Sequence, residues 1–257
     1  MRHNERRPSE SRRIVVGIHS AREAIRVRPN KISEIWLKEG ADRVHELKEF
    51  VEFAKTRQIK TKMQPDGVLS KFATSHQGVC LYIDETPEFD LNDLDNNTQE
   101  HCILVALDEI SDPHNIGAAL RSAWLLGAKA LILPEMRSGS LTPAASKVAS
   151  GGAEHVPVVT THNLQIELTS LKDKGFWIYG LAGEATTALN EVKFNERVVL
   201  VIGSEDKGLR STTRKTCDEL ITIPQTDKHA SLNASVAAAV ALYEIRRQHS
   251  PRSKSLK

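Results

Sequence analysis

Three short stretches of the chain combine side chains that can bind a polar ligand and stabilise charge on it. They read N-x-G-x-x-x-R at residues 115–121, G-x-E-x-x-G-L-R at 203–210 and I-P-x6-S-L-N at 223–233. Amide, hydroxyl and guanidinium groups donate hydrogen bonds to oxygen atoms that become negative during a reaction, and such preorganised donors lower its barrier. The three stretches are therefore candidates for one site, provided that the fold brings them together.

Arg121 stands out in the first stretch because its neighbours on a predicted helix are almost all Ala, Leu or Trp. A charge in such a setting is paired, contacts a ligand or faces water. Asn115 lies just after Pro113, where the helix is expected to begin, and Asn is a favoured N-cap residue. Capping alone would also explain Asn115.

The second stretch follows an apolar strand and resembles a dinucleotide-binding glycine loop, except that Glu205 replaces the middle glycine. A carboxylate there would repel a pyrophosphate, so the loop is predicted to be a poor phosphate cradle. It can still hold a neutral or cationic cofactor. The alternative is an ordinary strand-to-helix turn with an exposed Glu.

The third stretch precedes an alanine-rich helix that is expected from about Ser235 to Arg247, with Asn233 or Ser235 as its N-cap. Small residues at positions 234, 237, 238, 239 and 241 allow another helix to approach closely. The pattern predicts either tight internal packing or a dimer interface.

The elements that would position these residues form two groups, separated by an acidic stretch. Residues 14–83 alternate strands and helices and predict a small α/β domain. Residues 102–248 contain continuous apolar runs, which are typical of parallel strands buried on both faces, separated by helices. We therefore expect an α/β protein with a basic tail at 1–13, a linker at 84–101, a larger parallel-sheet domain and a second basic tail at 249–257.

The charge distribution suggests a polyanionic partner, although the net charge is only +2. Residues 1–13 hold five Arg, residues 246–257 hold five Lys or Arg, and the stretch at 84–100 holds seven Asp or Glu. Basic ends and an acidic middle favour nucleic acid, but solvated tails would look the same. Three scattered cysteines without a C-x-x-C pair predict neither a zinc site nor a disulfide framework. The absence of an apolar run of membrane length and of a secretory signal favours the cytoplasm.

The three motifs, in this order, resemble the SpoU (TrmH-like) branch of the SPOUT RNA 2'-O-methyltransferases. The stretches VVGIHSAREAI and SHQGVCLYI look like the small RNA-binding domain, of the ribosomal-protein L30e type, that precedes the catalytic domain in this family. GGAEHVPVV and WIYGLAGEA also look like the bacterial members that modify a guanosine of 23S rRNA, and the H-Q-G motif points the same way.

The resemblance implies a C-terminal deep trefoil knot, S-adenosylmethionine as the cofactor, no metal, and a homodimer in which each active site is completed across the interface. It assigns Gly203, Ile223 and Leu232 to the cofactor. It assigns catalysis to Asn115, Arg121, Glu205, Ser231 and Asn233. Because a guanidinium stays protonated, we expect Arg121 to grip the ribose and a flanking phosphate rather than act as a base.

Several alternatives stay open at this stage. A tRNA is a second possible substrate, and a silent RNA-binding assembly factor is a second possible role. Gln225 and Asp227 stand where the family usually has Met and Gly, which leaves room for that second role. A nucleotide-dependent oxidoreductase is disfavoured because G-x-G-x-x-G is absent. Lys207, Arg210 and Arg214, at helical spacing, predict either a stripe along an RNA backbone or a solvated helix face.

Overall fold

The computed structural model describes residues 12–94, 101–135, 141–227 and 230–249. The chain divides into two compact units between Pro87 and Glu88. Each unit has its own hydrophobic core and is described separately below.

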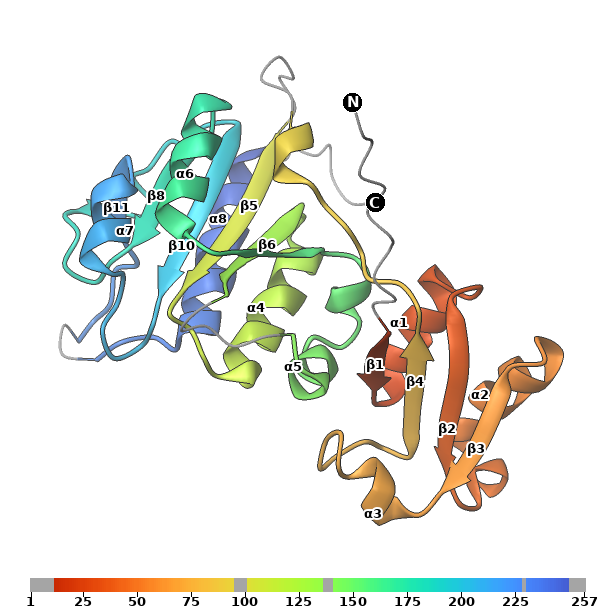
Figure 1. Cartoon of the computed structure of the whole chain (residues 1–257). Helices are drawn as coiled ribbons and strands as arrows, with labels where there is room; N and C mark the ends of the chain where they lie inside the picture. The colour runs from red at the N-terminus through yellow and green to blue at the C-terminus, as the bar shows by residue number, and fades with distance from the viewer. Residues whose placement is uncertain (1–11, 95–100, 136–140, 228–229, 250–257) are drawn as a thin grey trace, which may run out of the picture. The chain divides into compact units, whose positions relative to one another are not determined.

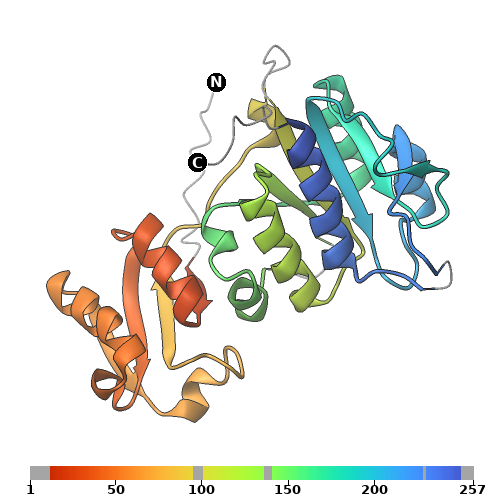
Figure 2. The ribbon, with the colours of Figure 1, turned by 180° about the vertical axis from the view of Figure 1, so that it is seen from behind.

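The smaller unit is a four-stranded mixed sheet with its two longer helices on one face and a short helix on the other. Its strands are β1 (Arg13–Val16), β2 (Ile32–Lys38), β3 (Lys60–Gln64) and β4 (Val79–Ile83), in the order β1-β4-β2-β3. Strand β4 is antiparallel to β1 and β2, and β2 is parallel to β3. Helices α1 (Ile18–Val27) and α2 (His45–Thr56) cover one face (Figures 1 and 2). Two further short helices are η1 (Ala41–Arg43) and α3 (Asp66–Leu69). The alternation of strands and helices expected from the sequence is present.

The H-Q-G motif forms a tight turn that supports the start of α1. The backbone N–H of Gly78 donates to Nδ1 of His76 (3.0 Å), and Nε2 of the same ring lies 3.3 Å from Asp66. Gln77 has a φ of 54°, and its side-chain oxygen accepts from the N–H of Ile18 (3.0 Å). That N–H belongs to the first turn of a helix and has no partner inside it. The motif therefore has a local structural role in this chain.

The larger unit is a seven-stranded sheet in which every paired strand is parallel, in the order β7-β6-β5-β10-β8-β11-β9. The strands are β5 (Cys102–Asp108), β6 (Ala130–Pro134), β7 (Val158–Thr161), β8 (Trp177–Leu181), β9 (Thr187–Ala188), β10 (Arg197–Gly203) and β11 (Glu219–Thr222). The helices are η2 (Leu91–Asp93), α4 (Pro113–Leu125), α5 (Pro143–Val148), η3 (Gly152–Glu154), α6 (Leu164–Asp173), α7 (Ser211–Thr216) and α8 (Ala234–His249). The α/β class with a parallel sheet is confirmed; the threading of the knot stays a prediction.

Helices cover both faces of this sheet, as continuous apolar strands require. Helices α4, α5 and α8 pack on one face, whereas α6 and α7 lie on the other (Figures 1 and 2). Every residue of β5 and of β10 is buried. The two strands are paired in register, so that Gly203 lies opposite Asp108. The loops that follow these strands therefore leave the sheet side by side.

The start of α4 differs from the expectation. Asp112, not Asn115, is its N-cap, and its carboxylate accepts from the N–H of His114 (2.9 Å). Pro113 takes the first helical position, where its missing N–H has no cost. Asn115 consequently lies inside the first turn, and its side chain is available for a long-range contact.

Candidate functional site

Asn115, Glu205 and Asn233, one from each motif, meet in a single hydrogen-bonded cluster. The side-chain amide of Asn115 donates to the carboxylate of Glu205 (3.1 Å). The amide of Asn233 donates to Oδ1 of Asn115 (2.9 Å) and also to the same Glu205 carboxylate. Asn115 is 9% exposed, so most of its surface is already covered by this contact and by the fold. The cluster links α4, the loop after β10 and the start of α8.

Glu205 is also bound to the first turn of α8. Its carboxylate accepts from the backbone N–H of Ala234 (3.2 Å). A helix N-terminus carries partial positive charge, so this position stabilises an ionised carboxylate. Asn233 is the N-cap of the same helix, because its Oδ1 accepts from the N–H (2.9 Å) and the hydroxyl (2.6 Å) of Ser235. The capping contact sets the orientation of the Asn233 amide, with its NH₂ group towards Glu205.

A pocket of about 300 Å³ lies beside this cluster. Gly203, Ile223 and Leu232, the three residues expected at the cofactor, all line it. Glu205 and Ser231 line it as well, so five of the predicted residues share one cavity. The other walls combine apolar side chains with loop residues: Leu181, Ala182, Gly183, Ile202, Ile221 and Ala237.

The backbone of the second motif closes the pocket tightly at two glycines. A Cβ added to Gly203 would lie 2.1 Å from the carbonyl carbon of Gly208. Gly208 has a φ of 64°, a conformation that favours glycine, and its N–H donates to the carbonyl of Ser204 (2.8 Å). The glycines of G-x-E-x-x-G therefore shape a narrow turn that carries Glu205, rather than a phosphate cradle.

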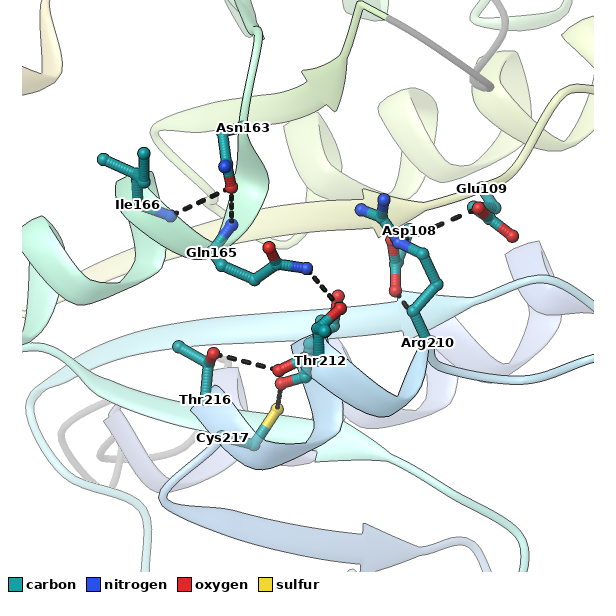
Figure 3. Close-up of polar contacts among 10 residues, drawn as sticks. Asp108, Glu109, Asn163, Gln165, Ile166, Arg210, Thr212, Thr216 and Cys217 are labelled. Carbon is teal, nitrogen blue, oxygen red and sulfur yellow. Dashed lines mark hydrogen bonds and ion pairs between the residues drawn. The ribbon is translucent and has the colours of Figure 1, made fainter.

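A buried ion pair fixes the other end of this loop. Asp108, at the end of β5, is fully buried and accepts from Nε (2.6 Å) and from the backbone N–H (3.0 Å) of Arg210 (Figure 3). Beyond Arg210, the side chain of Gln165 donates to the hydroxyl of Thr212, which ties α7 to α6 (Figure 3). Asp108 was not among the residues predicted for the site, although a carboxylate at the end of a buried apolar strand needs a partner.

The expected basic stripe is not formed on one helix. Helix α7 begins at Ser211, so Lys207 and Arg210 lie in the preceding turn and only Arg214 is helical. Arg210 is held by Asp108, and Arg214 pairs with Glu184. The Arg214 guanidinium lowers the pKa of the Glu184 carboxyl. Lys207, Arg214 and Glu184 all line the pocket, so its rim contains both signs of charge.

Arg121 is separate from the cluster within one chain. It is exposed and does not line the pocket. Among the described residues, its side chain forms no hydrogen bond or ion pair. Leu125, one turn later on α4, is 62% exposed. Helix α8, which packs against α4, presents Val236, Val240 and Tyr243 to solvent at spacings of four and three. The exposed side of α4 and α8 therefore combines these four apolar side chains with Arg121.

Gln225 and Asp227 line a second cavity of about 800 Å³ that adjoins the first. The two cavities share Gly183, Glu184, Thr222, Ile223, Gln225 and Ser231. Gln225 thus lines both cavities, whereas Asp227 lines only the second. Within the described ranges there is no group of three or more His, Cys, Asp or Glu side chains arranged for a metal ion. Nor do those ranges include a helix long and apolar enough to cross a membrane.

Comparison with known proteins agrees with this geometry. Residues 102–243 match the SpoU rRNA Methylase family, and residues 14–89 match the RNA 2'-O ribose methyltransferase substrate binding family. The chain is 37% identical over 246 residues to the 23S rRNA (guanosine-2'-O-)-methyltransferase RlmB of Photobacterium profundum, covering 91% of the chain and 97% of the relative. It is 38% identical to the RlmB of Yersinia pestis over 240 residues, with coverages of 91% and 97%.

Two further relatives extend the comparison. An uncharacterized tRNA/rRNA methyltransferase of Synechocystis is 45% identical over 177 residues, which cover 68% of the chain but only 46% of that longer relative. The SpoU methyltransferase AviRb of Streptomyces viridochromogenes, solved with AdoMet, shares the fold with a TM-score of 0.75 at 22% identity, over 91% of this chain and 89% of that one. From the family matches and the extended identity to RlmB proteins, we conclude that the chain belongs to the SpoU rRNA methylase family.

Proposed function

We propose that the protein transfers a methyl group from S-adenosylmethionine to the ribose 2'-hydroxyl of a guanosine in 23S rRNA, in the peptidyl-transferase region. The observation that carries the proposal is the position of the Asn115–Glu205–Asn233 cluster directly beside the pocket lined by Gly203, Ile223 and Leu232. The RlmB relatives, at more than a third identity over nine-tenths of the chain, support the guanosine of 23S rRNA as the substrate.

The pocket fits the cofactor in shape and charge. The cavity of about 300 Å³ is at the small end for ligand pockets, and Ile202, Ile221 and Ile223 supply apolar walls for an adenine ring. Glu184 and Glu205 line the cavity together with Lys207 and Arg214, so both signs of charge are present for the sulfonium, amino and carboxylate groups of the cofactor. Bound there, the sulfonium supplies an already activated methyl group, so that a metal is unnecessary.

The remaining work of the protein is to position the ribose. A 2'-hydroxyl is a weak nucleophile, and holding it in line for attack contributes several kcal/mol to the rate. Glu205 fixes the Asn115 and Asn233 amides through hydrogen bonds. Asn233 donates to Glu205 and Asn115, which leaves the second N–H of the Asn115 amide to donate to a ribose oxygen. Ser231 lines the cavity and can hydrogen-bond to the sugar or the cofactor. Donors of this kind stabilise the negative charge that develops on the ribose oxygen.

Arg121 enters the site from the second subunit of a homodimer in this proposal. It is exposed beside the apolar face of Leu125, Val236, Val240 and Tyr243, a face that a second copy would cover. Apolar helical faces of this kind are buried in obligate dimers. In the dimer, the Arg121 guanidinium donates hydrogen bonds to the ribose and to a flanking phosphate. It does so in its protonated form, so that it need not act as a base. A cytoplasmic location belongs to the same proposal.

Two other functions are less well supported. A tRNA substrate is less well supported because the RlmB relatives, named for 23S rRNA, match this chain over nine-tenths of its length. A silent assembly factor is suggested only by Gln225 and Asp227, and these residues leave the cavity open.

The deciding experiment is calorimetric titration of the purified protein with S-adenosylmethionine, followed by methyl transfer to 23S rRNA transcript and mapping of the modified ribose. Micromolar binding and one modified guanosine would support the proposal. Binding with modification of tRNA alone would favour the tRNA enzyme. No binding, with or without rRNA, would favour the assembly factor.

A further inference from the structure

The face of the small sheet that carries neither α1 nor α2 has an unusual composition. The strand registers place Glu34 beside Lys60 and Tyr82, and Trp36 beside Lys62 and Cys80. Registered neighbours point to the same side of a sheet, so these residues share one face. The residues that alternate with them, such as Ile35 and Leu81, belong to the core under the helices. The two faces are therefore chemically distinct.

Aromatic rings form the centre of this face. The Trp36 and Tyr82 ring centroids are 5.1 Å apart, and Phe72 packs edge-on against both. Trp36 and Tyr82 are only half-buried. Half-exposed aromatic rings on a sheet surface can stack with unpaired nucleic-acid bases.

Cations lie over these rings. The Arg12 guanidinium is 4.4 Å from the centroid of Tyr82, and Lys62 Nζ is 5.1 Å from that of Trp36. The side chains of Arg12 and Lys62 remain 46% and 41% exposed, and that of Lys60 is 67% exposed. A guanidinium stacked on a tyrosine also offers its outer plane to a base.

Glu34 holds the three cations in place. Its buried carboxylate lies 2.9 Å from Arg12, 2.8 Å from Lys62 and 3.8 Å from Lys60. One buried carboxylate thus gathers three basic side chains, and Asp84 lies 3.8 Å from one of them, Arg12. Helix α2, by contrast, exposes acidic and basic residues in alternation, so the helical side of the unit carries no such excess.

From this arrangement we propose that the face of the small sheet opposite α1 and α2 binds single-stranded RNA of the substrate, with bases against Trp36, Tyr82 and Arg12 and phosphates against Lys60 and Lys62. The proposal rests on the proposed function for the identity of the substrate. It adds which surface of the small unit the RNA contacts. Aromatic rings give sequence-tolerant stacking, while the lysines give salt-dependent attraction to the backbone.

The test compares two double variants of the full-length protein with equal loss of charge. Lys60→Ala with Lys62→Ala removes cations from the sheet face; Lys48→Ala with Lys55→Ala removes two exposed lysines from α2. Affinity for 23S rRNA transcript is measured across a range of salt concentrations. We expect the first variant to bind at least about tenfold more weakly, with a salt slope lower by about 1.4 for two lost phosphate contacts, and the second to bind as wild type does. Equal binding by the two variants would overturn the proposal.

Stacking is tested without altering the face. Trp124→Phe with Trp177→Phe leaves Trp36 as the single tryptophan, and its fluorescence is followed during titration with a uridine dodecamer. Quenching on binding is expected, whereas binding without any change in Trp36 emission would contradict stacking.

The proposed function and the proposed binding face are contradicted by different results. Wild-type protein that binds no S-adenosylmethionine and modifies no RNA contradicts the proposed function, while normal methyl transfer with equal affinities of the two lysine variants contradicts only the binding face.

Discussion

The side-chain amide of Asn115 and the carboxylate of Glu205 are hydrogen-bonded at 3.1 Å, although 90 residues separate them in the chain. The contact exists because β5 and β10 are parallel neighbours in register, so that the loops following them emerge together. Asn233 joins the pair from the start of α8. Three segments that are distant in sequence, the start of α4, the loop after β10 and the residue before α8, thus form one polar cluster beside a cavity.

Replacing Glu205 with Ala is expected to slow methyl transfer about 100- to 1000-fold, the range typical for loss of a preorganised polar group. The carboxylate orients two amides and is held by the N–H of Ala234. Single-turnover rates at saturating cofactor would measure the effect. Asp206→Ala is the matched control, because this neighbouring carboxylate is exposed and does not line the pocket. Similar losses in the two variants would contradict the assignment of Glu205.

Arg121→Ala is expected to abolish methyl transfer while leaving cofactor affinity unchanged, because Arg121 does not line the cavity of its own chain. The proposed dimer makes a sharper prediction for mixtures. Dimers of one Arg121→Ala chain and one Glu205→Ala chain contain one intact site if each site takes its arginine from the partner. Differentially tagged, co-purified mixed dimers should then have about half of the wild-type rate, by this count of sites. Inactive mixed dimers would place both residues in the same chain's site.

Gly203→Ala is expected to destabilise the larger unit by about 2 kcal/mol and to abolish cofactor binding. The added methyl group would lie 2.1 Å from backbone atoms of Gly208, so the loop must move, and overpacking of this kind costs roughly 1–3 kcal/mol. Gly183 also lines the pocket but has no atom within 4 Å of an added Cβ. Gly183→Ala should therefore change the free energy of unfolding by less than about 0.5 kcal/mol. Equal free energies of unfolding for Gly203→Ala and Gly183→Ala would contradict the prediction that a Cβ at position 203 is too close to the backbone of Gly208.

Asp108→Ala is expected to cost about 3 kcal/mol, since it leaves the Arg210 guanidinium without its buried partner. Glu184→Ala removes a partner from Arg214 at a site where the carboxylate is 61% exposed, so its cost should stay below about 1 kcal/mol. Urea unfolding of the two variants checks the difference. Comparable values would mean that the buried pair contributes no more than a surface one.

Glu34 should make the small unit sensitive to acid. Lys62, with help from Trp36 and Arg12, lowers the pKa of this carboxyl from 4.5 to about 2. A carboxyl with a lowered folded-state pKa stabilises the fold at pH values above its unfolded pKa, and this contribution is lost as the pH falls from about 4.5 towards 2. Urea unfolding of the Trp124→Phe, Trp177→Phe variant, followed by Trp36 fluorescence between pH 5 and pH 2.5, measures it. Glu34→Gln should flatten the curve in this window, and an unchanged slope would contradict the prediction.

Much of this protein could be predicted from local patterns. Continuous apolar runs in β5 and β10 identify buried parallel strands because only strands covered on both faces lack polar alternation. The carboxylate of Glu205 between the two glycines predicts a poor phosphate cradle, because it repels an anionic ligand wherever the loop lies. The order of the three motifs was sufficient to name the family, which the comparisons confirm.

Other features depend on contacts between distant residues, which local patterns do not contain. Asn115 looked like a helix cap, but Asp112 performs that role and frees Asn115 to bind Glu205. Lys207, Arg210 and Arg214 do not form the expected basic stripe, because Arg210 is paired with the buried Asp108 and Arg214 with Glu184. The energy of a buried charge depends on which partner the fold supplies, and strand order and register decide that partner. Strand alternation alone places Glu34 and Trp36 on one face of β2, but only the pairing of β2 with β3 and β4 brings Lys62 and Tyr82 to that face.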